Sequence, residues 1–281
     1  MKITVVGASG FIGRHLVAAL RSRGDHVVTA SLRDPASAAR AAAGSAVVVN
    51  LAGEPVAQRW SPSVKEAIRT SRTASVRPFV DALGALPEPP KAYVSASAIG
   101  YYGTSEDATF EESSGPGGGF LADVCVGWEA EADRAATHGM SVTKMRTGLV
   151  LGNDGGALAK LLPIFRLGGG GIVASGKQWY SWIHIDDQVG LYLHAIDGTS
   201  GVLNGTAPNP VRNSDFTFAL GHALHRPTVL PVPKFALQLI LGEGAEVVAS
   251  GQRVMPVRSL STGYRFRYDR VEDALAAIAA L

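Results

Sequence analysis

Short apolar runs separated by amphipathic segments occupy the first part of the chain. Residues 3–6 and 46–49 are near-continuous apolar runs, which is typical of strands buried on both faces of a parallel sheet. Between them, apolar residues recur at helical spacing from Ile12 to Leu20, and Gly24 predicts the end of that helix. The alternation predicts an α/β fold with a Rossmann-type doubly wound parallel sheet.

A glycine turn joins the first predicted strand to the first predicted helix. Its spacing is G-x-x-G-x-x-G, and it lies where backbone N–H groups and the helix dipole favour an anion. A glycine triplet also arises for steric reasons, but its place between strand and helix is the context that dinucleotide binding requires. The cofactor ligands predicted here are Gly7, Ser9, Gly10, Phe11, Ile12 and Gly13.

The end of the second predicted strand bears on which dinucleotide binds. An NAD enzyme usually places an acid there for the ribose hydroxyls, whereas this chain has Ser31, Leu32 and Arg33. A hydroxyl and a guanidinium suit a 2′-phosphate. Asp34 is the counter-argument, although Pro35 after it favours a helix cap. These residues therefore predict NADP(H) as the cofactor, with NAD as the less favoured alternative.

Two further segments are predicted to reach the cofactor. The run at 46–49 leads to Leu51, Ala52 and Gly53, whose small size permits close approach, although a plain strand-to-loop turn would look the same. A helix is expected to begin at Ser61, and beyond it Arg72 is placed to meet a cofactor phosphate or an acidic substrate. A solvated helix-face arginine is the alternative.

Composition narrows the class of protein. The 281 residues carry a net charge of +2 and no run of Lys or Arg, so nucleic acid and anionic membrane are not expected as partners. No apolar stretch reaches the roughly 18 residues of a membrane helix. The single cysteine, Cys125, fits a reducing cytoplasm, and the seven histidines form no metal-binding pattern. We expect a cytoplasmic protein without a metal, with a small-molecule substrate and a homodimer as the assembly to consider.

Several motifs together indicate a family. The glycine turn followed by Asn50 and "LAG" resembles the extended short-chain dehydrogenase/reductases, which include the nucleotide-sugar epimerases. The segments "SASAIGYYG", "WEAEA", "RTGLVLG" and "SWIHIDD" resemble an atypical, epimerase-family (sugar-nucleotide-epimerase-like) branch. The tail from "GEGAEVVASGQRVMP" onward is similar to the small C-terminal module of that branch. The resemblance covers essentially the whole chain.

The resemblance implies that separate regions of the chain bind the cofactor and the substrate. An NADP-binding Rossmann domain is expected at residues 1–152, continued by about 182–205. A smaller substrate-binding region is expected at 153–181 and 206–281, with the C-terminal module starting at about 233.

Compared with typical members of the family, this chain lacks the catalytic tyrosine and lysine. Typical members use Tyr-x-x-x-Lys, in which the tyrosine is the general acid/base and the lysine lowers its pKa. If Glu129 is matched to the glutamate that commonly follows that lysine by four residues, Cys125 falls at the lysine position and Leu121 at the tyrosine position. Neither side chain can do the chemistry, and the atypical branch shares the loss.

The catalytic group is therefore unknown, and four residues are candidates: Ser97, Tyr101, Tyr102 and His184. Ser97 fits a ligand of substrate or nicotinamide better than a base, because an unassisted serine holds its proton near neutral pH. Tyr101 and Tyr102 follow a predicted strand, and aromatic residues at such a turn commonly serve packing rather than acid/base chemistry. His184 is expected to be a structural hydrogen-bonder, with Asp186 or Asp187 capping the next helix.

The substrate side is rich in glycine and aromatic residues. Residues 153–176 contain two glycine clusters around a helix-like stretch, which suits a mobile lid or a plain exposed loop. Aromatic residues follow at a proposed cleft and favour a small planar or sugar-like ligand. The predicted substrate ligands are Ser97, Arg146, Trp179 and Trp182, and Arg146 could equally contact only a helix end.

The sequence favours an NADP(H)-binding oxidoreductase that acts on a small carbonyl or alcohol without the Tyr-x-x-x-Lys pair. A nucleotide-sugar epimerase is the first alternative. A non-catalytic, NADPH-responsive regulatory or binding protein is the second. No sequence feature decides between enzyme and sensor.

Overall fold

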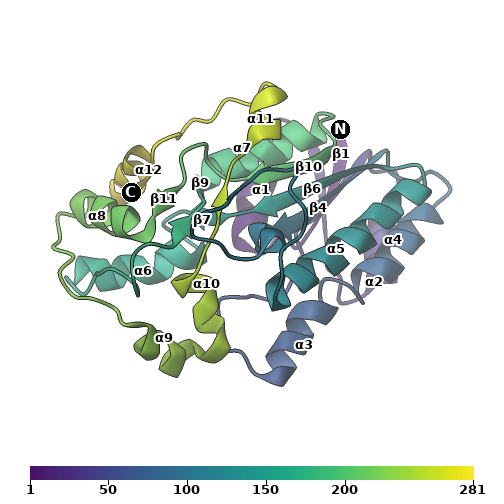
Figure 1. The fold of residues 1–281 in the computed structure, drawn as a ribbon. Coiled ribbons are helices and arrows are strands. Elements are labelled where there is room, and N and C mark those ends of the chain that lie inside the picture. Colours follow the sequence, from purple (N-terminus) through teal and green to yellow (C-terminus); the bar gives the residue numbers. More distant parts are fainter.

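A six-stranded parallel sheet runs through the centre of the computed structural model (Figure 1). The structure describes residues 1–281, apart from the side chains of Lys234, Ala236, Ile240 and Leu241. The strand order is β10 (Gly201–Gly205), β6 (Ser141–Thr147), β4 (Ala92–Ala98), β3 (Val47–Asn50), β1 (Lys2–Val6) and β2 (His26–Ala30), and every neighbouring pair is parallel. The predicted Rossmann-type doubly wound sheet is confirmed.

The strand order reverses at β1. This strand pairs with β2 on one side and with β3 on the other, so the connections leave in opposite directions. A crevice forms at such a switch point, outside the carboxyl ends of the strands, and it is where ligands bind in open α/β sheets. The sequence places the glycine turn at this point.

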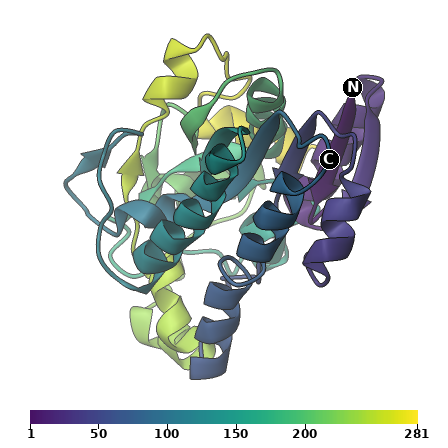
Figure 2. The same cartoon turned by 90° about the vertical axis from the view of Figure 1, so that its right-hand side faces the viewer.

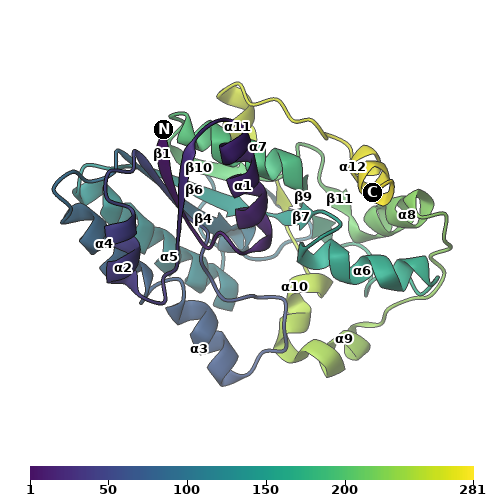
Figure 3. The ribbon, with the colours of Figure 1, turned by 180° about the vertical axis from the view of Figure 1, so that it is seen from behind.

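Two layers of helices cover the sheet (Figures 1 and 3). Side chains alternate along each strand, so Ile3 and Val5 pack with Leu16 of α1 (Phe11–Ser22), whereas Val6 packs with Phe79 on the opposite face. One layer consists of α1 (Phe11–Ser22) and α7 (Ile185–Ile196), and the other of α2 (Pro35–Ala41), α4 (Val76–Gly84) and α5 (Phe120–Thr137).

A second, smaller core lies beside the sheet. Trp182 is at its centre, packed with Phe165 of α6 (Gly156–Arg166), Phe216 of α8 (Asn213–Ala223) and Leu275 of α12 (Val271–Ala279). Three short strand pairs frame it: β7 (Leu149–Leu151) with β9 (Trp182–His184), β8 (Trp179–Tyr180) with β11 (Val211–Arg212), and β5 (Thr109–Phe110) with β12 (Arg253–Val254).

The C-terminal segment returns to the sheet. β12 pairs with β5, and the side-chain amide of Gln252 donates a hydrogen bond of 2.7 Å to the carbonyl of Ile99, at the end of β4. The remaining elements are α3 (Pro62–Thr70), the 3₁₀ turns η1 (Ile99–Tyr102) and η2 (Gly242–Ala245), α9 (Lys234–Leu241), α10 (Glu246–Ala249) and α11 (Val257–Ser261). Figures 1 and 2 show α3 beside the segment that holds α9 and η2, and an ion pair between Lys65 and Glu243 joins the two.

Helix starts follow local capping chemistry. Asp34 accepts a hydrogen bond from the Ser37 N–H at the start of α2, and Ser61 accepts one from the Val64 N–H at the start of α3. Both starts agree with the prediction. The start of α7 does not, because Nδ1 of His184, rather than Asp186 or Asp187, accepts the capping bond. A neutral imidazole can accept a hydrogen bond at one ring nitrogen. The prediction considered only the two carboxylates as caps.

Candidate functional site

The glycine turn lies at the switch point between β1 and β3. Gly7 has φ +79°, and a Cβ on it would lie 2.9 Å from the backbone nitrogen of Ala52. A Cβ on Gly13 would lie 2.3 Å from the carbonyl oxygen of Gly7. Gly10 differs, because its nearest neighbour would be 3.3 Å away. The protein's own backbone therefore requires glycine at positions 7 and 13, whereas Gly10 keeps a space open.

The N-terminus of α1 fits a phosphate group. Gly10 stands at the cap position, and no side chain accepts a hydrogen bond there from the first N–H groups of the helix. The first turn contains no acidic residue that would compete with an anion. Free N–H groups and the positive end of the helix dipole are the features that bind a pyrophosphate.

Phe11 and Ile12 use their side chains elsewhere. Ile12 packs against the core between the sheet and α1. The Phe11 ring supports the loop after β7, since a Cβ on Gly152 or Gly155 would lie 2.7 or 2.4 Å from it. These two residues can offer only their backbone to a cofactor, and Phe11 ties the turn to the glycine-rich segment. Asp154 of that loop strengthens the tie through an ion pair of 2.9 Å with Arg14.

The end of β2 suits a 2′-phosphate. Ser31 and Arg33 are both exposed there, and the Arg33 side chain makes no ion pair among the residues that the structure describes. Leu32 is buried in the core, so only its backbone faces the crevice. Oδ1 of Asp34 accepts the capping hydrogen bond of α2, so this acid has a local structural role that does not require a ribose. That role weakens the main argument for NAD.

Arg72 is a buried cation at the same crevice. It is 9% exposed, and its Nη1 and Nη2 donate to the carbonyls of Ile68 and Glu54, at 3.1 and 2.9 Å. The guanidinium stacks on the Trp128 ring at 4.9 Å and lies against Gly53, where a Cβ would come within 3.0 Å. Burial lowers the pKa of Arg72, and no carboxylate in the described part of the chain pairs with it. An anion in the crevice would offset the cost of burying this charge.

A buried polar chain crosses the sheet below η1. Ser97 donates a hydrogen bond of 2.7 Å to Oε1 of Glu129, and Arg146 donates to both oxygens of that carboxylate. Arg146 also donates to the hydroxyl of Tyr102, which in turn donates to Oδ1 of Asn204 at 2.7 Å. Burial raises the pKa of Tyr102 to about 12. Each of these groups has its hydrogen bonds satisfied inside the protein.

This chain of contacts engages the polar groups of three residues that were predicted as catalytic or substrate-binding. The Ser97 hydroxyl is engaged as a hydrogen-bond donor to Glu129, and the buried Tyr102 hydroxyl both accepts from Arg146 and donates to Asn204. Arg146 is fully paired with Glu129, so its charge is compensated without a substrate anion. The geometry gives all three a structural task.

The sequence analysis did not predict the buried hydrogen-bonding roles of Glu129 and Asn204. Only the role of Glu129 could have been inferred from the sequence. Leu121, Cys125 and Glu129 are spaced by four residues and share one helix face. An acid on a buried face needs a charged partner.

The face of α5 that lost the catalytic pair is covered. A Cβ on Gly100 of η1 would lie 3.3 Å from Cβ of Leu121 and 3.8 Å from Sγ of Cys125. Cys125 is buried, and burial raises the pKa of its thiol to about 12. The lysine position, Cys125, is therefore closed to a substrate, whereas the tyrosine position, Leu121, is partly exposed but carries a side chain that cannot titrate.

Tyr101 and His184 have opposite surroundings. Tyr101 is partly exposed, and the Arg146 guanidinium carbon lies 3.4 Å from the centre of its ring. Its hydroxyl makes no hydrogen bond with the described residues. His184 is buried, caps α7 and stacks on Tyr268 with ring centres 4.1 Å apart. Its surroundings are those of a structural residue.

The two tryptophans predicted as substrate ligands differ in solvent exposure. Trp182 is 0% exposed and donates from Nε1 to the carbonyl of Asn209, so it cannot touch a substrate and that prediction is corrected. A strand position at the centre of the second core explains its burial. Trp179 is partly exposed, and its Nε1 donates to the carbonyl of Glu106.

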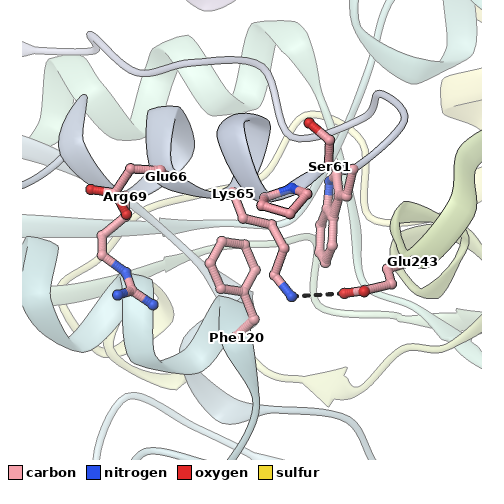
Figure 4. A pocket seen from close by; sticks show the side chains of 8 residues that line it. Ser61, Lys65, Glu66, Arg69, Phe120 and Glu243 are labelled. Carbon is pink, nitrogen blue, oxygen red and sulfur yellow. Dashed lines mark hydrogen bonds and ion pairs between the residues drawn. The ribbon is translucent and has the colours of Figure 1, made fainter.

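A cavity of about 270 Å³ opens where α3 meets the C-terminal segment (Figure 4). Across it, Nζ of Lys65 lies 2.7 Å from Oε2 of Glu243, and the Phe120 ring lies under Lys65 at 4.9 Å. None of these residues was predicted as a ligand. The lining residues are Trp60, Ser61, Pro62, Lys65, Glu66, Arg69, Phe120 and Glu243.

Comparison with known proteins decides the family. Residues 3–207 match the NAD dependent epimerase/dehydratase family, and residues 232–278 match a domain of unknown function, DUF1731. The chain belongs to this epimerase family. The predicted recognition, including the C-terminal module, is confirmed.

Relatives of this epimerase-family chain are similar to it over most or all of their length. It is 45% identical to the chloroplastic epimerase family protein SDR39U1 homolog of Arabidopsis thaliana, over 99% of this chain and 86% of that protein. It is 34% identical to the epimerase family protein YfhF of Bacillus subtilis, over 100% of this chain and 98% of that protein. The crystal structure of human SDR39U1 with NADPH matches with a TM-score of 0.94 and 33% identity, covering 100% of this chain and 99% of that chain.

Helices that could cross a membrane are lacking among the residues described here. The Arabidopsis relative is named chloroplastic, so the cytoplasmic location stays a prediction, as does the homodimer.

Proposed function

We propose that this epimerase-family chain binds NADP(H) and transfers a hydride between that cofactor and a small carbonyl or alcohol. The observation that carries the proposal is the glycine turn at the β1–β3 switch point, with a free helix N-terminus and the exposed Arg33 at the end of β2. The human relative solved with NADPH supports the same cofactor. Residues 1–152 and about 182–205 form the cofactor part, and residues 153–181 and 206–281 form the substrate part.

The cofactor site uses charge at two places. Arg33 and Ser31 hold the 2′-phosphate, because a guanidinium and a hydroxyl donate to phosphate oxygens. Arg72, whose charge has no carboxylate partner in the described chain, faces an anionic group beside Gly53, either the pyrophosphate or an acid on the substrate. Each arginine thus places a positive charge beside a negatively charged group of the ligand.

Tyr101 donates the proton. Bound NADPH supplies a hydride to the carbonyl carbon, and the carbonyl oxygen takes a proton from the phenol. Of the four candidates, Ser97, Tyr102 and His184 have their polar atoms engaged, whereas the Tyr101 hydroxyl makes no bond with described residues. The Arg146 guanidinium carbon, 3.4 Å from the centre of the Tyr101 ring, holds the ring in place, and solvent returns the proton because Tyr101 is partly exposed. Arg146 is thus a positioning residue.

The test measures loss of NADPH absorbance with a panel of aldehydes, ketones and quinones. Tyr101→Phe should lower kcat by about 10²–10⁴-fold, the usual loss of a general acid, while NADPH affinity stays within twofold. Tyr268→Phe is the matched control, because its hydroxyl also makes no hydrogen bond with the described residues, and it should keep full turnover.

Cofactor choice is tested by calorimetry. The ratio of NADPH to NADH affinity should fall by about 10–100-fold in Arg33→Ala, the value of one charge-assisted phosphate contact. NADPH binding without turnover of any carbonyl compound would overturn the oxidoreductase and favour a non-catalytic, NADPH-responsive protein. Equal binding of both nucleotides would overturn the cofactor site.

A further inference from the structure

The cavity of about 270 Å³ between α3 and the C-terminal segment has an aromatic wall (Figure 4). The Phe120 ring, at the start of α5, meets the Trp60 ring edge-on, with ring centres 5.2 Å apart. Trp60 is fixed in turn, because its Nε1 donates a hydrogen bond of 2.9 Å to the carbonyl of Val56. Sites for drug-sized ligands span roughly 300–1,000 Å³, so this cavity suits a smaller molecule with an apolar part.

One helix places two cations beside the Phe120 ring. Lys65 and Arg69 are four residues apart on α3, so they lie on the same helix face. Nζ of Lys65 is 4.9 Å and the guanidinium carbon of Arg69 is 5.9 Å from the centre of the ring, and Figure 4 shows the two side chains on either side of it. The ring attracts both cations and thereby holds the guanidinium at the cavity wall, with its N–H groups available to donate.

The two cations differ in their partners. Nζ of Lys65 lies 2.7 Å from Oε2 of Glu243, so an opposite charge already compensates it. The Arg69 side chain is exposed and forms neither an ion pair nor a hydrogen bond with any residue that the structure describes. A guanidinium in this state can bind a carboxylate through two parallel hydrogen bonds.

The cavity also contains a carboxylate with unused acceptors. Glu66 lines it one helical turn before Arg69, and its side chain makes no ion pair or hydrogen bond within the described part of the chain. The lining holds two cations and two carboxylates, so its net charge is zero and it favours neither a net anion nor a net cation. A ligand that carries both charges and an apolar side chain matches the guanidinium, the carboxylate and the aromatic wall together.

We infer that this cavity binds a free α-amino acid with an apolar or aromatic side chain. Arg69 binds the carboxylate of the ligand, Glu66 accepts hydrogen bonds from its ammonium group, and its side chain lies against the Phe120 ring. The ion pair between Lys65 and Glu243 holds the two walls of the cavity together. The inference goes beyond the proposed function, because none of these residues belongs to the cofactor site or donates the proton.

The experiment titrates phenylalanine and leucine into NADPH-saturated protein by calorimetry. Phenylalanine should bind, whereas phenylpropionate and phenethylamine, which each lack one of its two charges, should bind at least about tenfold more weakly. Failure of both amino acids to bind would overturn the inference. An analogue that binds as tightly as phenylalanine would also overturn it, because the cavity would then recognise only one charge.

Two variants test the assigned contacts. Arg69→Gln and Glu66→Gln each remove one charge from an exposed position, and each should weaken phenylalanine binding at least about tenfold. The matched controls are Arg40→Gln and Glu88→Gln, at exposed positions outside the cavity and without ion pairs among the described residues. They should change the affinity by less than about twofold.

Two outcomes would contradict the assignment of Arg69 and Glu66. Unchanged phenylalanine affinity in both variants would mean that these charges belong to an ordinary solvated helix face. NADPH affinity, measured on the same variants without amino acid, should stay within about twofold of the unaltered protein. A loss of NADPH affinity in Arg69→Gln as large as the loss of phenylalanine affinity would assign this arginine to the cofactor and overturn the inference.

Discussion

Arg146 of β6 and Glu129 of α5 form a two-point ion pair, with Nε to Oε1 at 2.7 Å and Nη2 to Oε2 at 2.8 Å. Burial by itself lowers the pKa of Arg146, but the hydrogen bonds and charge of Glu129 outweigh it, and the pKa is raised. The pair occupies the face of α5 that lost Tyr-x-x-x-Lys, one turn beyond Cys125. A structural ion pair and a covering turn now stand beside the place of the catalytic pair.

Glu129→Gln tests how much this pair stabilises the fold. Glutamine keeps the shape of the side chain but leaves the Arg146 cation buried without an opposite charge. Breaking one side of a buried pair costs about 3–5 kcal/mol, so the free energy of unfolding in urea should fall by that amount. Asp133→Asn is the control on the same helix, because Asp133 is 55% exposed and its bond to Lys144 is worth less than about 1 kcal/mol. Equal losses would contradict the assignment.

Gly7→Ala and Gly10→Ala should separate folding from cofactor binding. Alanine at position 7 meets both a left-handed φ and the backbone of Ala52, so the free energy of unfolding should fall by at least about 2 kcal/mol. Alanine at position 10 meets only one contact of 3.3 Å, so stability should change by less than about 1 kcal/mol. NADPH affinity should nevertheless drop at least tenfold in Gly10→Ala, measured by calorimetry. Unchanged affinity would show that no phosphate approaches Gly10.

His184 predicts a loss of stability in mild acid. Burial lowers its pKa below the ordinary value of about 6.5; Asp186 and Asp187 oppose the shift, and Arg267 and His15 add to it. The unfolded chain therefore binds a proton at a higher pH than the folded chain does. The free energy of unfolding should fall as the pH drops below about 6.5 and stay level above it.

His184→Asn keeps an acceptor for the Asp186 N–H but cannot titrate. Urea unfolding at pH 7 and pH 5 should show a smaller difference for this variant than for the unaltered protein. His222→Asn, at an exposed position, should keep the original difference. The same slope in His184→Asn would mean that other groups cause the acid sensitivity.

Cys125 should be chemically silent in the folded protein. Burial raises the pKa of its thiol to about 12, and thiol reagents attack the thiolate. A colorimetric thiol reagent should therefore label the protein only after unfolding in guanidinium. Val126→Cys places a thiol one residue along α5 at a position that is 41% exposed, and this variant should react at once in the native state. Rapid native labelling of Cys125 itself would show that η1 does not cover this face.

The amino-acid sequence determined the features that depend on neighbours along the chain. The strand, turn and helix around Gly7, the run of Ser31, Leu32 and Arg33 at the end of β2, the caps at Asp34 and Ser61, and the lost pair at Leu121 and Cys125 can all be recognised from the order and spacing of residues. Local backbone geometry and helical periodicity act within a few residues, so a sequence reader can apply them directly.

Only the tertiary structure decided which distant side chains meet. Tyr102 and Asn204 are 102 residues apart and share a hydrogen bond, and Trp179 receives Arg212 and Arg253 from two other strands. The same packing buries Trp182 and leaves Trp179 partly exposed, although both are aromatic residues of neighbouring short strands. Strand order and register set these meetings, because they fix which strand ends lie side by side, and no spacing along the chain encodes that order.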